Sequence, residues 1–110
     1  MQDIPEFVVC FAFINNEKRA SRIKNEVLEK KICSGVTVVP FARTFLIKDN
    51  DVITHNDLMM IFRTKFEKVE ELKTTVLANN TKEVADFFVL PVVDGSVSFF
   101  EWVSKELSKD

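Results

Sequence analysis

The distribution of apolar positions divides the chain into segments with two different periods. Phe7–Ile14 is continuously apolar and lies between Pro5 and a pair of asparagines, which is typical of a short strand covered on both faces. Residues 17–31 change to the helical period, in which side chains three and four positions apart share a face. The apolar positions of this predicted helix are Ala20, Ile23, Val27 and Leu28.

Two long β-rich runs follow the predicted helix. Residues 36–47 are dominated by Val, Phe and Thr, and residues 52–62 by Ile, Leu and Met. The Asp-Asn-Asp segment at residues 49–51 is typical of a hairpin turn. Pro40 interrupts the first run, and because proline has no amide donor we expect a bulge, a bend or an edge position there.

The rest of the chain, from residue 64 on, predicts a helix, a strand and a final helix. Thr64–Glu67 has capping-box spacing, in which the Thr and Glu side chains bond each other's exposed amides, so we expect a helix to begin there and to end near residues 79–80. Residues 87–92 predict a strand, and Ser98–Glu101 repeats the capping-box spacing before the last helix. The apolar stripes are Phe66, Val69, Leu72 and Val76 on one helix, and Phe99, Val103 and Leu107 on the other.

The predicted order β-α-β-β-α-β-α contains a split βαβ pair, which is the ferredoxin-like motif. The expected fold class is therefore α/β (α+β): a ferredoxin-like βαββαβ sandwich with a long central hairpin and a C-terminal helix, in a single domain over residues 1–110. The hairpin is longer than such a domain needs. Its far half is expected to project with unpaired edges, which favours contacts between subunits.

Composition indicates a globular protein and excludes several partners. The 110 residues are 46% apolar and 29% charged, with eleven Phe, one Trp and no Tyr. The net charge is −2, and Lys and Arg are interspersed with Glu on the predicted helices, whereas a nucleic-acid binder concentrates positive charge on one face. No apolar run is long enough to cross a bilayer. We therefore expect neither nucleic acid nor membrane as a partner.

The two cysteines and the acidic start of the chain indicate a cytoplasmic location. Cys10 and Cys33 lie far apart, whereas a secreted disulfide scaffold of this size carries more cysteines. The apolar run after the acidic start has no small-residue cleavage site, so no signal peptide is predicted. Cys10 is expected in the core. Cys33 lies at a helix end beside Ser34 and Gly35, where we expect it to be exposed and reactive.

The C-terminal quarter carries the most specific pattern. Leu90-Pro91-Val92 ends a predicted strand, Gly95 lies in a turn, and Phe99-Phe100-Glu101-Trp102 lies in the last predicted helix. This arrangement resembles the CutA divalent-cation tolerance family, in which a Leu-Pro-Ile-like triplet and a Gly precede a Tyr-Leu-x-Trp helix. Residues 29–41 and 57–64 are similar to two further segments of that family. The resemblance therefore covers nearly the whole chain.

The resemblance implies a homotrimer that responds to divalent metal ions, copper among them. The chain also departs from the family, because Gly35 stands where the family has Cys. Residues 80–86 keep only the acidic positions of the family's His-Pro-Tyr-Glu-x-Pro-Glu stretch, Glu83 and Asp86. By resemblance, these two side chains line a cleft between subunits. The alternative, which the pattern favours, is that they solvate a linker and the start of a strand.

A candidate metal site depends on His55, the only histidine of the chain, and on Asp57 two positions later. Imidazole and carboxylate groups bind Zn(II) or Cu(II), and a trimer could gather ligands from several chains. Cys33 is the third candidate ligand, and the implied cofactor is Cu(II) or another divalent cation. The alternative, which the pattern favours, is a polar and solvent-exposed part of the hairpin.

The remaining motifs argue for binding rather than catalysis. Phe99 and Trp102 are expected to anchor the last helix on the sheet or against a neighbouring subunit, since an RNA-binding aromatic surface would need basic residues around it. Gly35 and Gly95 are the only glycines, so no phosphate-binding loop or nucleophile elbow is present, and we expect no enzyme activity. The second candidate function is a PII-like trimeric signalling or scaffolding protein without a metal, which depends on fold analogy alone.

Overall fold

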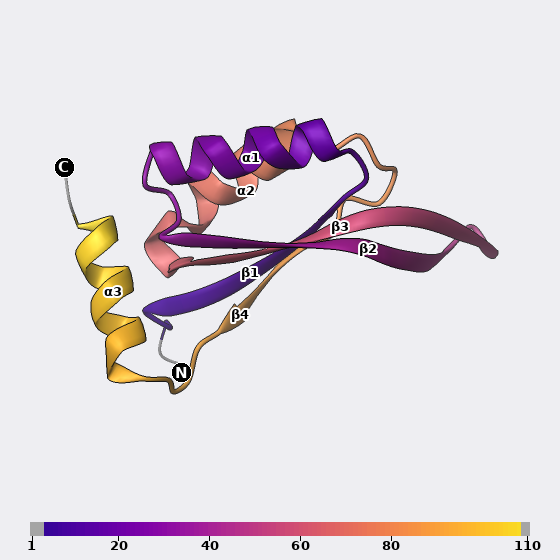
Figure 1. Ribbon diagram of the computed structural model, residues 1–110. Helices are drawn as coiled ribbons and strands as arrows, with labels where there is room; N and C mark the ends of the chain where they lie inside the picture. The colour runs from indigo at the N-terminus through magenta and orange to yellow at the C-terminus, as the bar shows by residue number, and fades with distance from the viewer. Residues whose placement is uncertain (1–3, 109–110) are drawn as a thin grey trace.

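The chain folds into an antiparallel sheet with α1 and α2 on one face and α3 at one end of the sheet (Figure 1). This computed structural model describes residues 4–108. The elements run β1 (Phe7–Ile14), α1 (Glu17–Glu29), β2 (Gly35–Lys48), β3 (Asp51–Lys65), a 3-10 turn η1 (Phe66–Lys68), α2 (Val69–Ala78), β4 (Phe87–Pro91) and α3 (Val97–Leu107). The predicted order and the placement of two helices on one face are confirmed.

The strand order is β2-β3-β1-β4, with every neighbouring pair antiparallel. This is the arrangement expected of a split βαβ pair. β1 lies in the middle, and its alternate residues Val8, Cys10, Ala12 and Ile14 are fully buried under the helices. The intervening residues are only half-buried. The expected burial of β1 on both faces is therefore wrong for the single chain, because α1 and α2 cover one face only.

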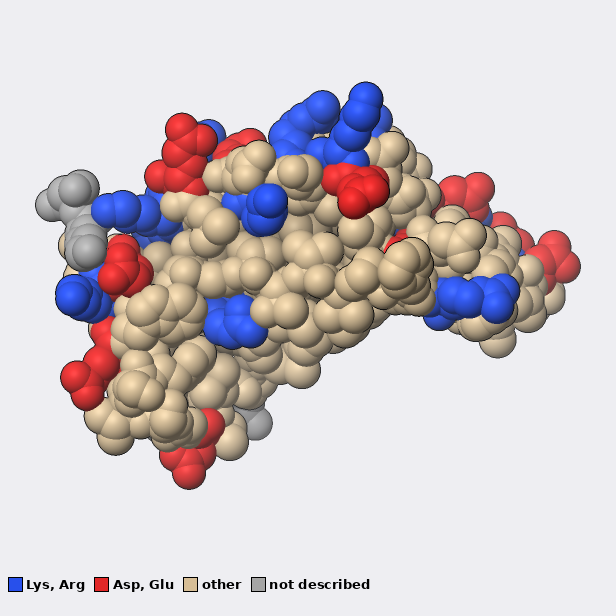
Figure 2. All heavy atoms as spheres, viewed as in Figure 1, with Lys and Arg blue, Asp and Glu red and all other residues tan. Residues whose placement is uncertain are grey.

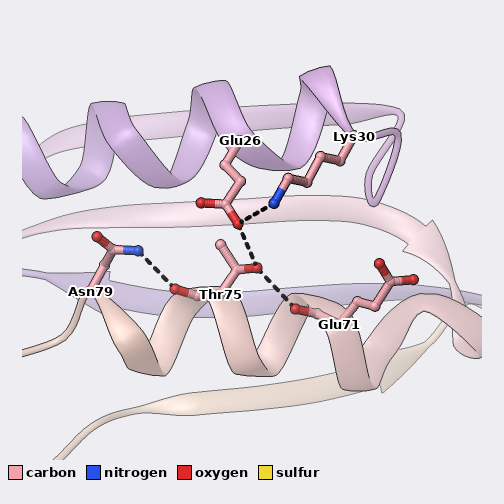
Figure 3. Close-up of polar contacts among 5 residues, drawn as sticks. All are labelled: Glu26, Lys30, Glu71, Thr75 and Asn79. Atoms are coloured by element: carbon pink, nitrogen blue, oxygen red, sulfur yellow. Dashed lines mark hydrogen bonds and ion pairs between the residues drawn. The ribbon is translucent and has the colours of Figure 1, made fainter.

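The core lies between the sheet and α1 and α2. Its buried side chains come from β1, α1, the α1–β2 connection, β3 and α2. Leu28 is 40% exposed and does not belong to it, contrary to expectation. One polar contact joins the two helices: Thr75 Oγ1 donates to Glu26 Oε2 at 3.4 Å (Figure 3). The same hydroxyl donates to Glu71 O at 3.0 Å within α2, and Lys30 pairs with Glu26 at 3.2 Å along α1.

The β2–β3 hairpin extends well beyond the rest of the molecule (Figure 1). Lys48 pairs with Asp51, and the two residues between them have φ angles of 52° and 69°, which is the left-handed pair that a tight hairpin turn requires. The pairing shifts between Val39 and Ala42, so the bulge predicted at Pro40 is confirmed. Phe41 follows the proline with φ 63° and is 93% exposed, an unusual conformation for a bulky residue.

Both predicted capping boxes are wrong. Thr64 still belongs to β3, is fully buried, and its hydroxyl donates to Ile32 O at 2.6 Å. It therefore holds the α1–β2 connection against the sheet, and α2 begins after the 3-10 turn. The last helix is capped by Ser96, whose Oγ accepts from Phe99 N at 3.2 Å, two positions before the predicted cap at Ser98. α2 therefore begins without a side-chain cap, whereas α3 is capped by a neighbouring serine.

α3 packs against the end of the sheet through aromatic side chains. The Phe7 ring lies 4.7 Å from that of Phe100 and 6.4 Å from that of Phe99. Gly35 at the start of β2 makes room for Trp102, since a Cβ at this position would lie 2.7 Å from the indole ring. In the described part of the chain, no helix is both long and apolar enough to span a membrane.

Candidate functional site at the root of the hairpin arm

A buried ion pair lies at the root of the projecting half of the hairpin, which we call the hairpin arm (residues 42–57). Lys82 Nζ lies 2.9 Å from Asp57 Oδ2, and neither side chain has any exposed surface. Thr44 Oγ1 donates to the same carboxylate oxygen at 2.6 Å, and Lys82 Nζ also donates to Phe13 O at 3.5 Å. Two donors therefore saturate one oxygen of Asp57.

The bulge and the segment between α2 and β4 position these groups. Asp57 pairs with Ala42, the first residue in register after the bulge, and Thr44 follows on the same face of β2. Lys82 belongs to residues 79–86, where its backbone amide donates to Asn80 Oδ1 at 2.9 Å. Further along the arm, Lys48 Nζ pairs with Glu83 at 3.1 Å. Residues 79–86 are thus tied to the arm at two points.

Three buried side-chain atoms around this ion pair have no hydrogen-bond partner among the described residues: His55 Nε2, Asp57 Oδ1 and Asn80 Nδ2. His55 pairs directly with Thr44 across the hairpin, and Thr44 in turn bonds Asp57. The three side chains therefore lie on one face of the arm. A buried polar atom without a partner costs free energy, so such atoms in one place call for an explanation.

The structure brings two of the three predicted metal ligands onto one face and leaves the third elsewhere. His55 and Asp57 share a face of β3, whereas Cys33 lies in the core beyond the far end of α1. Within residues 4–108, no group of three or more His, Cys, Asp and Glu side chains is arranged to hold a metal ion. A site built by one chain alone would therefore need ligands of another kind.

Neither cysteine offers a reactive thiolate. Cys33 is 2% exposed and its amide donates to Val27 O at 3.1 Å, so the expectation that it is exposed and reactive is wrong. Burial raises the pKa of the Cys33 thiol above its ordinary range, and the nearby Cys10 adds to the shift. Burial also raises the pKa of Cys10 to about 12. The prediction that Cys10 is a core residue is confirmed. Both thiols stay protonated at neutral pH.

The other predicted site residues lie in two separate regions. The Glu83 side chain is 68% exposed and turned toward Lys48 on the arm of its own chain, and Asp86 is half-buried directly before β4. Their placement in a cleft between subunits stays a prediction. Phe99 and Trp102 lie on α3 with ring centroids 6.4 Å apart, Phe99 facing Phe7 and Trp102 facing Gly35.

Lys82 is the charged residue of this site that the sequence did not indicate. It lies 25 positions from Asp57 in a short polar connection, where a lysine is ordinarily solvated. No spacing or periodicity joins the two residues. Only the path of residues 79–86 past the end of β1 brings the ammonium to the carboxylate.

Comparison with known proteins places the chain in a family. The sequence profile described as CutA1 divalent ion tolerance protein matches residues 8–106. The chain belongs to the CutA1 family. The resemblance noted in its sequence is thereby confirmed.

Relatives of the CutA1 family are similar at low identity. The chloroplastic protein CutA of Arabidopsis thaliana is 24% identical over 87% of this chain and 53% of its own length. The divalent-cation tolerance protein CutA of Pectobacterium atrosepticum is 23% identical over 97% of this chain and 99% of its own. The chain thus spans about half the length of the plant relative and nearly all of the bacterial one.

Solved structures of CutA1 proteins share the fold. CutA1 from a psychrotrophic Shewanella superposes with a TM-score of 0.89 at 18% identity, over 97% of this chain and 100% of that one. At this identity the likeness establishes the fold and not the chemistry of a site. The function of the buried ion pair has to be argued from this chain's own residues.

Proposed function

We propose that this chain is a non-catalytic, cytoplasmic homotrimer that acts in tolerance to divalent metal ions, with copper as the leading ion. Family membership supports the divalent-ion part of this proposal, since the matching profile and the bacterial relative both carry divalent ion tolerance in their names. The trimer, the copper ion and the cytoplasmic location go beyond the family description. Assembly and location are argued below from the chain itself, and copper is the ion that the resemblance implies.

The observation that supports assembly is the apolar surface that a single chain leaves uncovered. On the sheet face opposite α1 and α2, Phe88 is 44% exposed and its ring stacks on that of Phe11 at 5.4 Å. On the arm, Phe45 is 61% and Ile47 is 80% exposed. Figure 2 shows mostly uncharged atoms from the middle of the molecule to the arm. Large apolar side chains exposed in this way are typical of subunit interfaces.

The edges of the sheet support a closed ring of subunits. β2 and β4 are the outer strands and each leaves one side without a ladder partner. If the arm of one subunit covers the edge or face of the next, three copies related by a threefold axis satisfy every edge in the same way. Assembly and stability would then be inseparable.

The cysteines support the cytoplasmic location and argue against catalysis by a thiolate nucleophile. Both thiols are free and buried, and their raised pKa values remove the thiolate that a nucleophile or a disulfide exchange would need. Free thiols fit a reducing compartment. Fractionation of cells that express the tagged full-length protein tests the location.

Native mass spectrometry with and without stoichiometric Cu(II) tests the proposal as a whole. We expect a trimer at micromolar concentration that gains discrete copper masses. Ile47→Asp should dissociate it because a carboxylate would be buried in the interface, whereas Ser21→Asp on the exposed side of α1 is the matched control and should leave it intact. A trimer that takes up no copper favours the PII-like scaffolding alternative. A folded monomer contradicts the assembly.

A further inference from the structure

His55 and Asp57 present two unsatisfied ligand atoms on one face of a strand. Side chains at positions i and i+2 of a strand point the same way and are separated by two residue rises, about 6.5 Å between their Cα atoms. An imidazole nitrogen and a carboxylate oxygen at that spacing are able to reach one ion placed above the strand. His55 Nε2 and Asp57 Oδ1 are both buried and have no hydrogen-bond partner within the described chain.

The donor types favour a borderline transition-metal ion. Imidazole suits Zn(II) and Cu(II), and carboxylate accompanies it in sites for these ions, whereas Mg(II) prefers oxygen ligands alone. Thr44 lies across from His55, and its hydroxyl donates to Asp57 Oδ2 at 2.6 Å. This hydrogen bond orients the carboxylate through the oxygen that does not face the ion. Hydrogen bonds of this kind to a ligand group raise metal affinity.

Lys82 already supplies a positive charge to this carboxylate. Its ammonium lies 2.9 Å from Asp57 Oδ2 and has no exposed surface. An ion bound to the other oxygen of the same carboxylate would lie within a few ångströms of the ammonium, where two positive charges repel strongly. The ion and the ammonium are therefore alternatives.

We propose that His55 and Asp57 form a binding site for a divalent transition-metal ion, and that the Lys82 ammonium is a tethered competitor that the ion displaces. The inference rests on the proposed function in metal-ion tolerance and names the residues that would carry it. Two ligands come from one chain, and water or a neighbouring subunit completes the coordination. Cys33 takes no part, because it is buried in the core far from the arm.

Displacement of Lys82 by the ion would change how residues 79–86 are attached to the hairpin arm, and this change can be measured. Residues 79–86 are held to the arm by the Lys82–Asp57 pair and by the exposed Lys48–Glu83 pair. An exposed pair contributes little, so the buried one is the main attachment. Binding of the ion would release Lys82 to solvent and loosen this segment, which leads directly into the edge strand β4.

Calorimetric titration of the wild-type protein with ZnCl2, CuCl2 and MgCl2 is the first measurement. We expect Zn(II) and Cu(II) to bind and Mg(II) not to bind. His55→Ala should weaken Zn(II) binding roughly tenfold or more through loss of a ligand. Lys82→Met should strengthen it roughly tenfold or more, because the competing charge is removed. Lys48→Met, which removes the exposed ammonium that pairs with the same segment, is the matched control and should change affinity less than about twofold.

Lysine acetylation with an N-hydroxysuccinimide ester gives a second readout on the wild-type chain. The buried Lys82 should be nearly unreactive without metal and should become labelled when Zn(II) is added, as read by peptide mass spectrometry. The metal-induced labelling should disappear in His55→Ala. This arm keeps the proposal testable if Lys82→Met, which leaves Asp57 buried without a counter-ion, does not fold.

The outcomes separate the site from the function. Zn(II) or Cu(II) binding that is unchanged by His55→Ala and by Lys82→Met, with Lys82 unlabelled, overturns this site and leaves metal tolerance to other residues. No binding of either ion to the wild-type trimer overturns the metal function and this site together. If Lys82→Met strengthens binding and a second substitution at His55 then abolishes it, both the metal function and this site are supported.

Discussion

The two halves of the β2–β3 hairpin have the same kind of sequence and opposite environments. In the inner half, Met60 and Phe62 are fully buried, because α1 and α2 cover that face of the sheet. In the arm, the strands are paired just as regularly, yet Phe45 is 61% and Ile47 is 80% exposed. Strand pairing in this protein is thus a local property. Burial depends on what the tertiary structure, or another subunit, places over the strands.

Several unusual features of the hairpin lie at the boundary between the halves. The bulge and the left-handed Phe41 lie on β2, and the buried Asp57 lies beside them on β3. Residues 79–86 contact the hairpin at the same level, where Lys82 pairs with Asp57. The point at which the core ends is therefore also the point at which polar groups become buried.

The largest expected effect comes from removing the same aromatic group in each half. Phe62→Ala should lower the free energy of unfolding by about 3–5 kcal/mol, through lost burial and a cavity in the core. Phe45→Ala should change it by less than about 0.5 kcal/mol in a monomer, because the ring is mostly exposed. Urea unfolding followed by circular dichroism at several protein concentrations measures both. A loss at Phe45 that appears only where the protein is assembled would locate that ring in the subunit interface.

A smaller effect is expected at the start of the inner half, where β2 meets α3. Gly35→Ala places a Cβ 2.7 Å from Trp102, so the indole or the strand must move, at about 1–3 kcal/mol. Trp102 is the only tryptophan, so its fluorescence reports the change directly. Gly95→Ala is the matched control, since its Cβ would meet nothing closer than 3.4 Å. Equal destabilisation by both substitutions would show that loss of glycine flexibility, and not the contact with Trp102, is responsible.

At the boundary, Phe41→Gly should raise the free energy of unfolding by about 1 kcal/mol. The φ of 63° is strained for phenylalanine and relaxed for glycine, and little burial is lost from a side chain that is 93% exposed. Phe41→Ala keeps a Cβ in the strained conformation and should show no such gain. Thermal unfolding of the three proteins decides between them. A loss of stability in both variants would mean that the ring is buried in the assembly.

The smallest effect at neutral pH concerns the thiols of the covered face. Burial raises the Cys10 pKa from 9.0 to about 12. Between these two pH values, unfolding therefore ionises a thiol that is neutral in the folded protein. Stability from this group is complete below pH 9 and is lost as the pH rises toward 12, and Cys10→Ala should remove this part of the pH dependence.

Thiol labelling at pH 8 should leave Cys10 and Cys33 unmodified in the folded protein. A cysteine introduced by Thr54→Cys on the exposed arm should react at once, and comparable rates at all three positions would contradict the difference between the halves.

The sequence predicted the elements well and the ends of the elements poorly. The strand and helix order, the hairpin turn and the bulge at Pro40 follow from periodicity and from the backbone limits of proline, asparagine and aspartate, which act locally. The cap at Thr64 was wrong because its hydroxyl bonds Ile32 O, which is distant in the sequence, and α2 begins without a side-chain cap. The cap at Ser98 was wrong because Ser96 also lies near the helix start and serves as the cap.

The candidate site was predicted only in part for the same reason. His55 and Asp57 stand two positions apart, so their shared face follows from strand geometry once the strand is recognised. Lys82 and the exclusion of Cys33 could not be foreseen. Each depends on where a connection between elements passes, and the sequence of a connection does not encode its path.

By itself, the sequence determined the family, the order of the elements and the length of the hairpin, because these depend on short-range spacing and on residue types that limit the backbone. Only the tertiary structure decided which apolar residues are covered, that Cys33 is buried, and that a lysine from the α2–β4 connection neutralises Asp57. Burial and charge pairing are properties of groups that come together across the chain, so their free energies become defined only when the helices and connections are in place.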